Sequence, residues 1–311
     1  MTGRFAPTPT GGLHVGNLRT ALVSWLAARR AGQPWLIRVE DLDRVRLPQA
    51  EAIAAAQLAD LAQLGLTSDA PVVRQSDRFD YYAQAVAHLD VYECFCSRKD
   101  VAEASQAPHG ATPRYPGTCR QLSAAERADR HARRPGCWRV NAHGARVTVA
   151  DALHGQVCAP VDDFVVRRAD GLYAYNLAVV VDDGLQGVDH VVRGDDLLAS
   201  SPRQAWLASQ LGFKPPSYLH VPLVCQRDGT RLAKRQSAID LNALASQGLT
   251  PADVLHRLAW SLGLAQPGQS VDLMDLVDRF DPARLPLTPW RTDPSTWRPD
   301  DQVELSFGRR T

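Results

Sequence analysis

Apolar residues recur along the first part of the chain with the two spacings expected of alternating strands and helices. Short apolar runs at 3–7 and 35–40 predict buried strands. Between these runs lies an apolar face with helical spacing, which predicts a helix that ends at Gly32 and Pro34. This face consists of Leu18, Ala21, Leu22, Trp25, Leu26 and Ala28. The order strand–loop–helix–strand is typical of the beginning of a parallel α/β sheet.

The same alternation continues through most of the chain. The further strands that we expect lie at 72–74, 188–193 and 219–225, and the further helices at 48–64, 77–90 and 201–212. From about Asp240 the pattern is helical, with proline-rich breaks near 282–299. We expect roughly the last twenty residues to be loosely ordered.

Residues 91–145 differ in character from what precedes them, because cysteines, Pro-Gly turns and a charged segment at 126–134 replace the regular apolar pattern. Strands resume at 137–141, 147–149 and 164–168, and Ala169-Asp170-Gly171 predicts a hairpin turn. We therefore predict an α/β fold. A catalytic domain with a Rossmann-type parallel sheet spans 1–240 and carries an insertion at about 91–168, and a short helical C-terminal unit spans 241–311.

Composition narrows the class of protein. The chain has 311 residues with 45% apolar composition, enough for one large domain with an insertion or for two domains. No apolar run is long enough to span a bilayer, and the N-terminus lacks a basic segment followed by an apolar one. We expect a cytoplasmic protein with no membrane partner and, since no oligomer is indicated, a monomer. The net charge is only +1, so a nucleic-acid partner would have to bind a local arginine-rich surface and not the protein as a whole.

The loop from Arg4 to Asn17 joins the first strand to the first helix and has the chemistry of a nucleotide site. Glycines allow a polyphosphate to approach the backbone, hydroxyls donate to it, and a helix N-terminus favours negative charge. His14 can donate to a phosphate or ribose. The expected ATP-binding residues here are Thr8, Thr10, Gly11, Gly12, His14, Gly16 and Asn17. A Gly/Pro-rich turn with a surface histidine is the alternative, which the combination of features disfavours.

The residues of this loop resemble those of class I aminoacyl-tRNA synthetases, in the form seen in the glutamyl branch: Arg-Phe-Ala-Pro-Thr-Pro-Thr-Gly-Gly-Leu-His at 4–14. The usual His-Ile-Gly-His of that family reads His14-Val15-Gly16-Asn17, so one expected phosphate donor is replaced. The resemblance covers about 3–240. It implies activation of L-glutamate with ATP and Mg²⁺, with His14 as a catalytic residue.

A second motif, Arg231-Leu232-Ala233-Lys234-Arg235, resembles the Lys-Met-Ser-Lys-Ser loop of this family, which closes over ATP. The resemblance makes Arg231, Leu232 and Lys234 ATP-binding residues and Lys234 catalytic, because a cation neutralises charge as pyrophosphate leaves. Taken alone, the five residues would fit a solvated basic loop better. Their position after a predicted strand and an Arg-Asp-Gly turn favours the functional interpretation.

Glutamate carries an ammonium group and two carboxylates, so its pocket needs an acid and one or two arginines. The resemblance assigns this pocket to Arg4, Phe5, Ala6, Pro7, Thr8, Glu40, Tyr175 and Arg193. Each residue alone could be an ordinary surface residue at a strand end. Three of these segments are expected at the C-terminal ends of parallel strands, where an α/β sheet binds ligands.

Three of the six cysteines, Cys94, Cys96 and Cys119, lie close together in the sequence and suggest one Zn²⁺. The fourth ligand is open. A truncated branch of the family, which attaches glutamate to queuosine, is similar in having Cys-x-Cys and then Tyr-x-x-x-Cys, which implies Tyr115. A phenol must lose its proton to bind well, so His109 is chemically easier although no pattern indicates it. Unmetallated thiols are the alternative.

About 75 residues follow the Lys234 loop, too few for the large anticodon-binding region of glutamyl-tRNA synthetases. The resemblance to the truncated branch implies that glutamate goes to the queuosine base in the anticodon of tRNA(Asp), which the catalytic domain itself must receive. Arg133, Arg134 and Trp138 are candidates for that contact, although a solvated face would explain the arginines. Two alternatives stay open: a compact enzyme charging a tRNA 3′ end, and a non-catalytic paralogue that binds nucleotide or tRNA.

Overall fold

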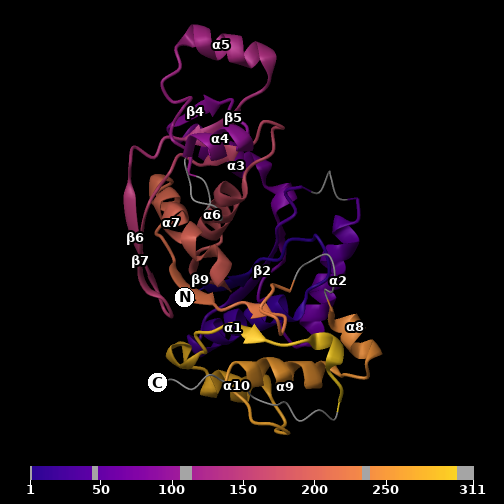
Figure 1. The fold of residues 1–311 in the computed structure, drawn as a ribbon. Coiled ribbons are helices and arrows are strands. Elements are labelled where there is room, and N and C mark those ends of the chain that lie inside the picture. Colours follow the sequence, from indigo (N-terminus) through magenta and orange to yellow (C-terminus); the bar gives the residue numbers. More distant parts are fainter. Residues whose placement is uncertain (1, 44–47, 106–113, 233–238, 300–311) are drawn as a thin grey trace.

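The computed structural model describes residues 2–43, 48–105, 114–232 and 239–299. A seven-stranded sheet in the order β3-β2-β1-β9-β10-β6-β7 forms the centre of the molecule (Figure 1). All neighbouring pairs are parallel except β6 and β7, which form an antiparallel hairpin. The strands are β1 (Thr2–Phe5), β2 (Trp35–Val39), β3 (Val73–Arg74), β6 (Arg146–Asp151), β7 (Gly155–Pro160), β9 (Val188–Gly194) and β10 (Ser217–Val221). The predicted Rossmann-type α/β fold is confirmed.

Helices cover the sheet, and all of those that follow are predicted from the sequence except α6. They are α1 (Val15–Arg30), α2 (Ala50–Gln63), α3 (Phe79–Ala87), α6 (Tyr175–Leu185) and α7 (Ser201–Gln210). All five residues of β2 are buried, as expected of a strand covered on both faces. The chain crosses from β1 to β2 on one side and reaches β9 on the other. The gap between the C-terminal ends of β1 and β9 is therefore the switch point where such sheets bind ligands.

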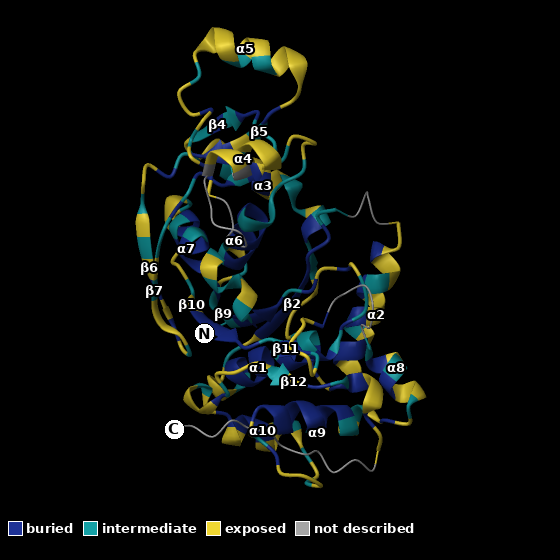
Figure 2. Cartoon of the chain, in the orientation of Figure 1, coloured by how far each residue is buried: buried dark blue, intermediate teal, exposed yellow. Residues whose placement is uncertain are grey.

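A second, three-stranded antiparallel sheet stands at one end of the molecule and carries the cysteines (Figure 1). It consists of β4 (Val91–Cys94), β5 (Cys137–Val140) and β8 (Val165–Arg167), and its helices are α4 (Arg98–Ser105) and α5 (Ala124–Arg133). None of the residues of α5 is buried, and Figure 2 shows it projecting from the end of the molecule. A capping box between Ser123 and Glu126 holds its first turn.

The hairpin β6–β7 lies inside the range predicted for the insertion but extends the main sheet. Tyr218 of β10 pairs with Asp151 at the end of β6, and β7 completes the edge. The sequence analysis predicted only a short strand at 147–149, because β7 has no buried residue and shows no apolar alternation.

The C-terminal segment is helical as predicted, with α8 (Leu241–Ser246), α9 (Pro251–Ser261) and α10 (Leu273–Arg279). Its core is continuous with that of the main sheet, because Leu18 and Leu22 of α1 share one buried cluster with Val254 and Leu258 of α9. Figure 2 shows the buried face of α9 turned towards α1. The C-terminal helices thus pack onto α1 through a shared apolar core.

The prediction of a single strand at 219–225 is wrong, since β10 ends at Val221 and a separate strand, β11 (Val224–Cys225), follows Pro222. A proline lacks the N–H that a ladder requires, which explains the break. Strand β11 pairs in parallel with β12 (Trp290–Arg291), which the sequence did not predict. No helix in the described ranges has the length and apolar character needed to cross a membrane.

Candidate active site

The N-terminus of α1 is built around His14. The imidazole Nδ1 accepts hydrogen bonds from the backbone N–H groups of Gly16 at 3.1 Å and Asn17 at 3.3 Å. Since Nδ1 accepts, a neutral His14 carries its proton on Nε2, where it can be donated. The Asn17 side chain accepts from the backbone N–H of His14 and so completes a capping box. Asn17, which replaces the second histidine of the family motif, thus serves the cap through its side chain.

Two glycines of this loop are required by their neighbours. A Cβ on Gly16 would come within 3.0 Å of the His14 ring, and a Cβ on Gly12 would come within 2.8 Å of Asp240. Gln57 of α2, which is 2% exposed, donates to the carbonyls of Thr8 and Gly11 at 3.1 and 2.7 Å. The loop is therefore held in place before any ligand arrives. The first turn of α1 contains no acidic residue, which leaves its positive end available to an anion.

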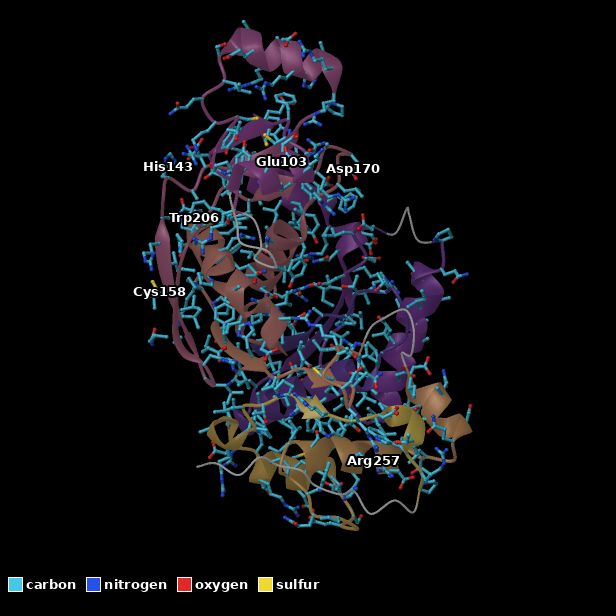
Figure 3. All side chains as sticks on the ribbon, in the orientation of Figure 1. Glu103, His143, Cys158, Asp170, Trp206 and Arg257 are labelled. Atoms are coloured by element: carbon cyan, nitrogen blue, oxygen red, sulfur yellow. The ribbon has the colours of Figure 1, made fainter. Side chains whose placement is uncertain are left out.

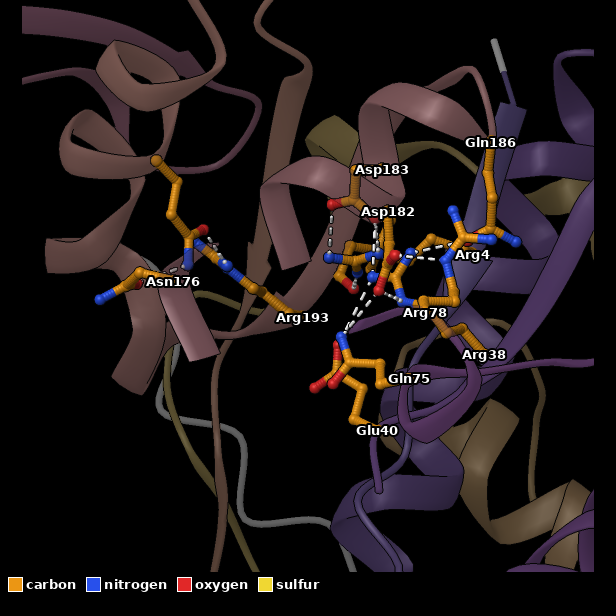
Figure 4. Close-up of polar contacts among 12 residues, drawn as sticks. Arg4, Arg38, Glu40, Gln75, Arg78, Asn176, Asp182, Asp183, Gln186 and Arg193 are labelled. Atoms are coloured by element: carbon orange, nitrogen blue, oxygen red, sulfur yellow. Dashed lines mark hydrogen bonds and ion pairs between the residues drawn. The ribbon is translucent and has the colours of Figure 1, made fainter. Parts of the chain in front are cut away.

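Behind this loop lies a buried cluster of charges at the C-terminal ends of β1 and β2 (Figure 4). Arg4 donates to both oxygens of Asp183 at 3.2 Å. Arg38 lies 2.8 Å from Asp183, 3.4 Å from Glu40 and 3.6 Å from Asp182. Burial opposes the charge of Arg38, but these carboxylates outweigh it and raise its pKa.

Asp182 is satisfied from the other side as well. Gln75, Arg78 and Tyr82 donate to its carboxylate at 2.9, 2.6 and 2.8 Å. Through these ion pairs and hydrogen bonds, Asp182 and Asp183 of α6 connect β1, β2 and α3. Buried charges are stable only when paired in this way. Two residues of the group, Glu40 and Gln75, also line a cavity.

Three of the predicted glutamate residues, Thr8, Glu40 and Tyr175, line a cavity. The cavity has a volume of about 280 Å³, and Thr10 also lines it. Burial raises the pKa of Glu40, against the lowering effect of Arg38 and Arg4. Burial also raises the pKa of Tyr175, as do the charges of Glu40 and Asp183, against the lowering effect of Arg193 and Arg4. The lining of this cavity includes neither Arg4 nor Arg193, so the predicted glutamate pocket stays a prediction.

Tyr175 lies at the start of a helix and not at the end of a strand. Tyr175 is the first residue of α6, and Ala174 is its N-cap. The other residues of the segment at 5–7 support the pocket through the backbone, since the N–H of Glu40 donates to the carbonyl of Pro7 at 2.9 Å and Phe5 is buried. Ala6 is half-buried between them.

Arg193 lies near the end of β9 and is 5% exposed. Its guanidinium donates only to uncharged partners among the described residues: His220 at 3.0 Å, Gln204 at 2.6 Å, Ser201 at 2.9 Å and the carbonyl of Leu197 at 3.3 Å. The charge of Arg193 is therefore not neutralised by a carboxylate, in contrast with that of Arg4.

The hairpin before the second predicted motif approaches the N-terminus of α1. Cys225 forms an isolated antiparallel bridge with Arg231, and a Cβ on Gly16 would lie 3.5 Å from Val224. Arg231 is exposed and lies 3.5 Å from Asp196, and Leu232 is buried. Ala233, Lys234 and Arg235 lie outside the described residues. The role of Lys234 thus stays a prediction, supported by the place where its hairpin begins.

The predicted metal ligands lie together at the edge of the second sheet. The sulfur atoms of Cys94, Cys96 and Cys119 all lie within 4.8 Å of one another, and those of Cys96 and Cys119 are 3.6 Å apart. The hydroxyl of Tyr115 lies 3.3 Å from Cys94 Sγ and 3.9 Å from Cys96 Sγ, and the Cys119 N–H donates to it at 2.7 Å. Zn–S bonds of about 2.3 Å in a tetrahedron place sulfur atoms about 3.8 Å apart, so these residues fit zinc. His109 lies outside the described residues.

The sequence analysis missed a fourth thiol, Cys137, which pairs with Cys94 across β4 and β5. The thiol of Cys137 donates to Cys94 and holds the pKa of Cys94 well below its usual range. Burial raises the pKa of Cys96 to about 12 and also raises that of the Tyr115 phenol. One thiolate is thus preformed, while the other ligands would lose their protons on metal binding. Cys158 lies away from this group, on the outer hairpin β6–β7 (Figure 3).

A second cavity of about 680 Å³ adjoins the first. Cys96 and Tyr115 line it, and the two cavities share Asp43, Arg168 and Ala174 among their lining residues. Arg98 at the start of α4 and the buried Arg139 also line it. Arg139 stacks on the ring of Tyr115 at 3.9 Å. Basic side chains and an aromatic ring are suited to nucleic-acid backbone and bases.

Comparisons with known proteins agree with this geometry. Residues 1–273 match the family model described as tRNA synthetases class I (E and Q), catalytic domain. The glutamyl-Q tRNA(Asp) synthetase of Nocardia farcinica is 53% identical, over 93% of this chain and 92% of the relative. The glutamyl-Q tRNA(Asp) synthetase of Cutibacterium acnes is 49% identical, over 99% of this chain and 91% of the relative.

Among solved structures, the glutamate-tRNA synthetase from Elizabethkingia anophelis is similar with a TM-score of 0.77, over 94% of this chain and 68% of that chain. Its 23% sequence identity establishes the shared fold alone. The sequence relatives establish more. The chain belongs to the class I glutamyl- and glutaminyl-tRNA synthetase family and, within it, to the glutamyl-Q tRNA(Asp) synthetases.

Proposed function

We propose that this chain activates L-glutamate with ATP and transfers it to queuosine in the anticodon of tRNA(Asp). The proposal rests on the family to which the chain belongs and on two adjoining cavities, the first lined by Thr8, Glu40 and Tyr175 and the second by Arg98, Arg139 and Arg168. The names of the relatives agree with this substrate pair.

In the first step, ATP enters with Mg²⁺ and its phosphates lie against the N-terminus of α1. An oxygen of the glutamate α-carboxylate attacks the α-phosphorus, and the bond to pyrophosphate breaks. His14 is positioned to donate from Nε2, because its Nδ1 is held by the helix cap. Lys234 follows as the cation that receives the leaving charge. Holding the two reactants in register supplies much of the rate.

Glutamate recognition follows from charge. The six groups of the cluster balance, with Arg4, Arg38 and Arg78 against Glu40, Asp182 and Asp183. Arg193 adds one positive charge that no described carboxylate neutralises. Zwitterionic glutamate carries a net charge of −1, so it completes the balance, with Glu40 as the acceptor for its ammonium group.

In the second step, a hydroxyl of the cyclopentene-diol of queuosine attacks the carbonyl carbon of glutamyl-adenylate. An ester bond forms, AMP leaves, and the hydroxyl proton passes to solvent. The reaction needs no side-chain nucleophile. The larger cavity is the route that we propose for the acceptor base, since it adjoins the first cavity and shares Asp43, Arg168 and Ala174 with it.

Cys94, Cys96, Cys119 and Tyr115 are the ligands that we propose for one Zn²⁺. A bound zinc ion would cross-link β4 to the loop at 115–119 and fix one wall of the larger cavity. Since ATP, glutamate and tRNA are cytoplasmic substrates and the thiols are unpaired, we propose a cytoplasmic monomer.

Exchange of labelled pyrophosphate into ATP tests the activation step. We expect exchange that depends on L-glutamate and not on L-glutamine or L-aspartate. Glutamine lacks the charge that Arg193 requires, and aspartate is one methylene shorter. Absence of glutamate-dependent exchange near neutral pH would leave the non-catalytic alternative as the better account.

A further inference from the structure

A buried chain of hydrogen bonds leads from Arg193 through His220 to Asp151. Arg193 Nε lies 3.0 Å from His220 Nε2, and His220 Nδ1 lies 2.6 Å from Asp151 Oδ2. The three residues come from β9, β10 and the end of β6, and they are 5%, 0% and 5% exposed. The sequence analysis singled out Arg193 but neither of the other two.

The directions of these bonds fix the tautomer of His220. A guanidinium nitrogen always donates, so Nε2 of His220 accepts from Arg193 and its proton lies on Nδ1. That proton is donated to Asp151. Burial lowers the pKa of His220, which keeps the ring neutral near neutral pH.

Both carboxylate oxygens of Asp151 accept hydrogen bonds. One carboxylate oxygen accepts from the backbone N–H groups of Leu153 and His154 at 2.9 Å, and the other accepts from the backbone and ring of His220 at 3.0 and 2.6 Å. Burial opposes ionisation of Asp151, but these hydrogen bonds outweigh it and keep its pKa below the usual range. Asp151 therefore anchors the ring of His220 to the turn of the β6–β7 hairpin.

A nucleophilic role is excluded by the same contacts. Ser201, His220 and Asp151 stand in the order of a serine triad, with Ser201 Oγ 3.2 Å from His220 Nε2. Ser201 and His220 are both 0% exposed, and the lone pair of Nε2 already accepts from Arg193. The group has no access to an acyl substrate and no available base.

We propose that His220, held by Asp151, is a positioning residue that orients Arg193 while leaving the positive charge of Arg193 available to the substrate carboxylate. A carboxylate in place of His220 would hold the guanidinium as well but would neutralise it, as Asp183 does for Arg4. A neutral acceptor fixes the geometry without that loss. This inference rests on the proposed function, because it assigns Arg193 to glutamate.

Three variants at one position test the role: His220→Gln, His220→Glu and His220→Phe, measured by pyrophosphate exchange. Glutamine supplies a neutral acceptor, so we expect the KM for glutamate to stay within about 3-fold of the wild-type value. We expect His220→Glu and His220→Phe to raise this KM at least ~30-fold with the KM for ATP nearly unchanged, since one charged hydrogen bond is lost or one charge is cancelled. His154→Gln is a control, because the His154 ring lies 3.2 Å from the backbone carbonyl of His220 and its backbone bond to Asp151 does not depend on the side chain.

An equal rise in both KM values, or equal effects of the glutamine and phenylalanine variants, would overturn the proposal. A second measurement is independent of activity: ¹⁵N NMR of histidine-labelled wild-type protein at pH 7. We expect one Nδ1-protonated neutral ring whose signal disappears in His220→Gln. An imidazolium or an Nε2-protonated ring at this position overturns the inference even where exchange is normal. Absence of exchange in the wild type, with the expected tautomer present, would instead count against the proposed function.

Discussion

Arg4 and Asp183 form a two-pronged buried ion pair, with Arg4 Nε and Nη2 each 3.2 Å from one carboxylate oxygen of Asp183. The pair joins β1 to α6. Asp183 also lies 2.8 Å from Arg38 of β2, so this one carboxylate neutralises arginines of two neighbouring strands. The ion pairs therefore belong to the buried core that holds β1, β2 and α6 together.

Replacing this acid should unfold the protein before it alters specificity. Asp183→Asn leaves two buried guanidinium groups without their closest anion, which we expect to cost about 3–5 kcal/mol of unfolding free energy. Urea denaturation measures it. Glu51→Gln is the matched control, because Glu51 pairs with Arg74 at 2.8 Å on the surface and should cost no more than about 1 kcal/mol. Equal costs would mean that the buried cluster contributes no more than a surface pair.

The binding of glutamate should weaken on the acid side of neutrality. Burial raises the pKa of Glu40 above the usual 4.5, so Glu40 takes up a proton at a higher pH than an exposed carboxyl does. Only its ionised form accepts the substrate ammonium group. We expect the KM for glutamate to rise as pH falls through this raised pKa, while the KM for ATP changes little. In Glu40→Gln the KM should be high and flat; a remaining inflection would assign it to another group.

Charge on the wall of the larger cavity should affect the acceptor and not the amino acid. Arg98 and Lys99 are adjacent in α4 and both exposed, but only Arg98 lines the cavity. We expect Arg98→Glu to raise the KM for tRNA about 10-fold or more and to leave pyrophosphate exchange unchanged. Lys99→Glu is the matched control, with about a 2-fold effect or less. Equal effects of the two substitutions on the KM for tRNA would indicate long-range electrostatic attraction and no specific contact at Arg98.

Metal content should follow the cysteine cluster. We expect about one zinc ion per chain by elemental analysis, lost in Cys94→Ser and Cys119→Ser because each removes a thiolate ligand. Cys158→Ser should keep the zinc, since Cys158 is exposed on β7. Thermal unfolding of the metal-free protein should begin earlier, with β4, β5 and the loop at 115–119. A wild-type chain that binds no zinc after preparation with zinc would assign the cluster to free thiols.

Lys234, the cation of the second motif, should contribute to catalysis and not to folding stability. We expect Lys234→Ala to reduce exchange at least about 100-fold, because charge on the leaving pyrophosphate loses its partner, with a melting temperature close to that of the wild type. Arg227→Ala, an exposed change in the preceding turn, is the control and should retain full exchange. Normal exchange in Lys234→Ala would mean that this loop does not close over ATP.

The spacing of apolar residues was enough to predict those parts of the structure that depend on neighbouring residues in the sequence. The strands and helix that hold the loop at 4–17 follow from apolar spacing, and the position of Glu40 at a strand end follows from the same pattern. The break at Pro222 also has a local cause that the sequence displays. These are the features in which neighbours along the chain decide the structure.

Partners distant in sequence could not be predicted in this way. Asp183 lies 179 positions from Arg4, and Asp151 lies 69 positions from His220. Within an apolar helix such as α6, an acid gives no sign of which arginine it will meet. Cys137 had a weak signal as a further thiol in the insertion, but only the register of β4 and β5 places it beside Cys94.

The most direct test of the proposed function is the transfer of labelled glutamate, with ATP, to three purified tRNAs. They are tRNA(Asp) that contains queuosine but lacks its 3′-terminal adenosine, unmodified tRNA(Asp), and intact tRNA(Glu). We predict label on the first alone, in the anticodon fragment after nuclease digestion. Label on intact tRNA(Glu), with none on the shortened tRNA(Asp), would contradict the account and identify a compact enzyme that charges the 3′ end.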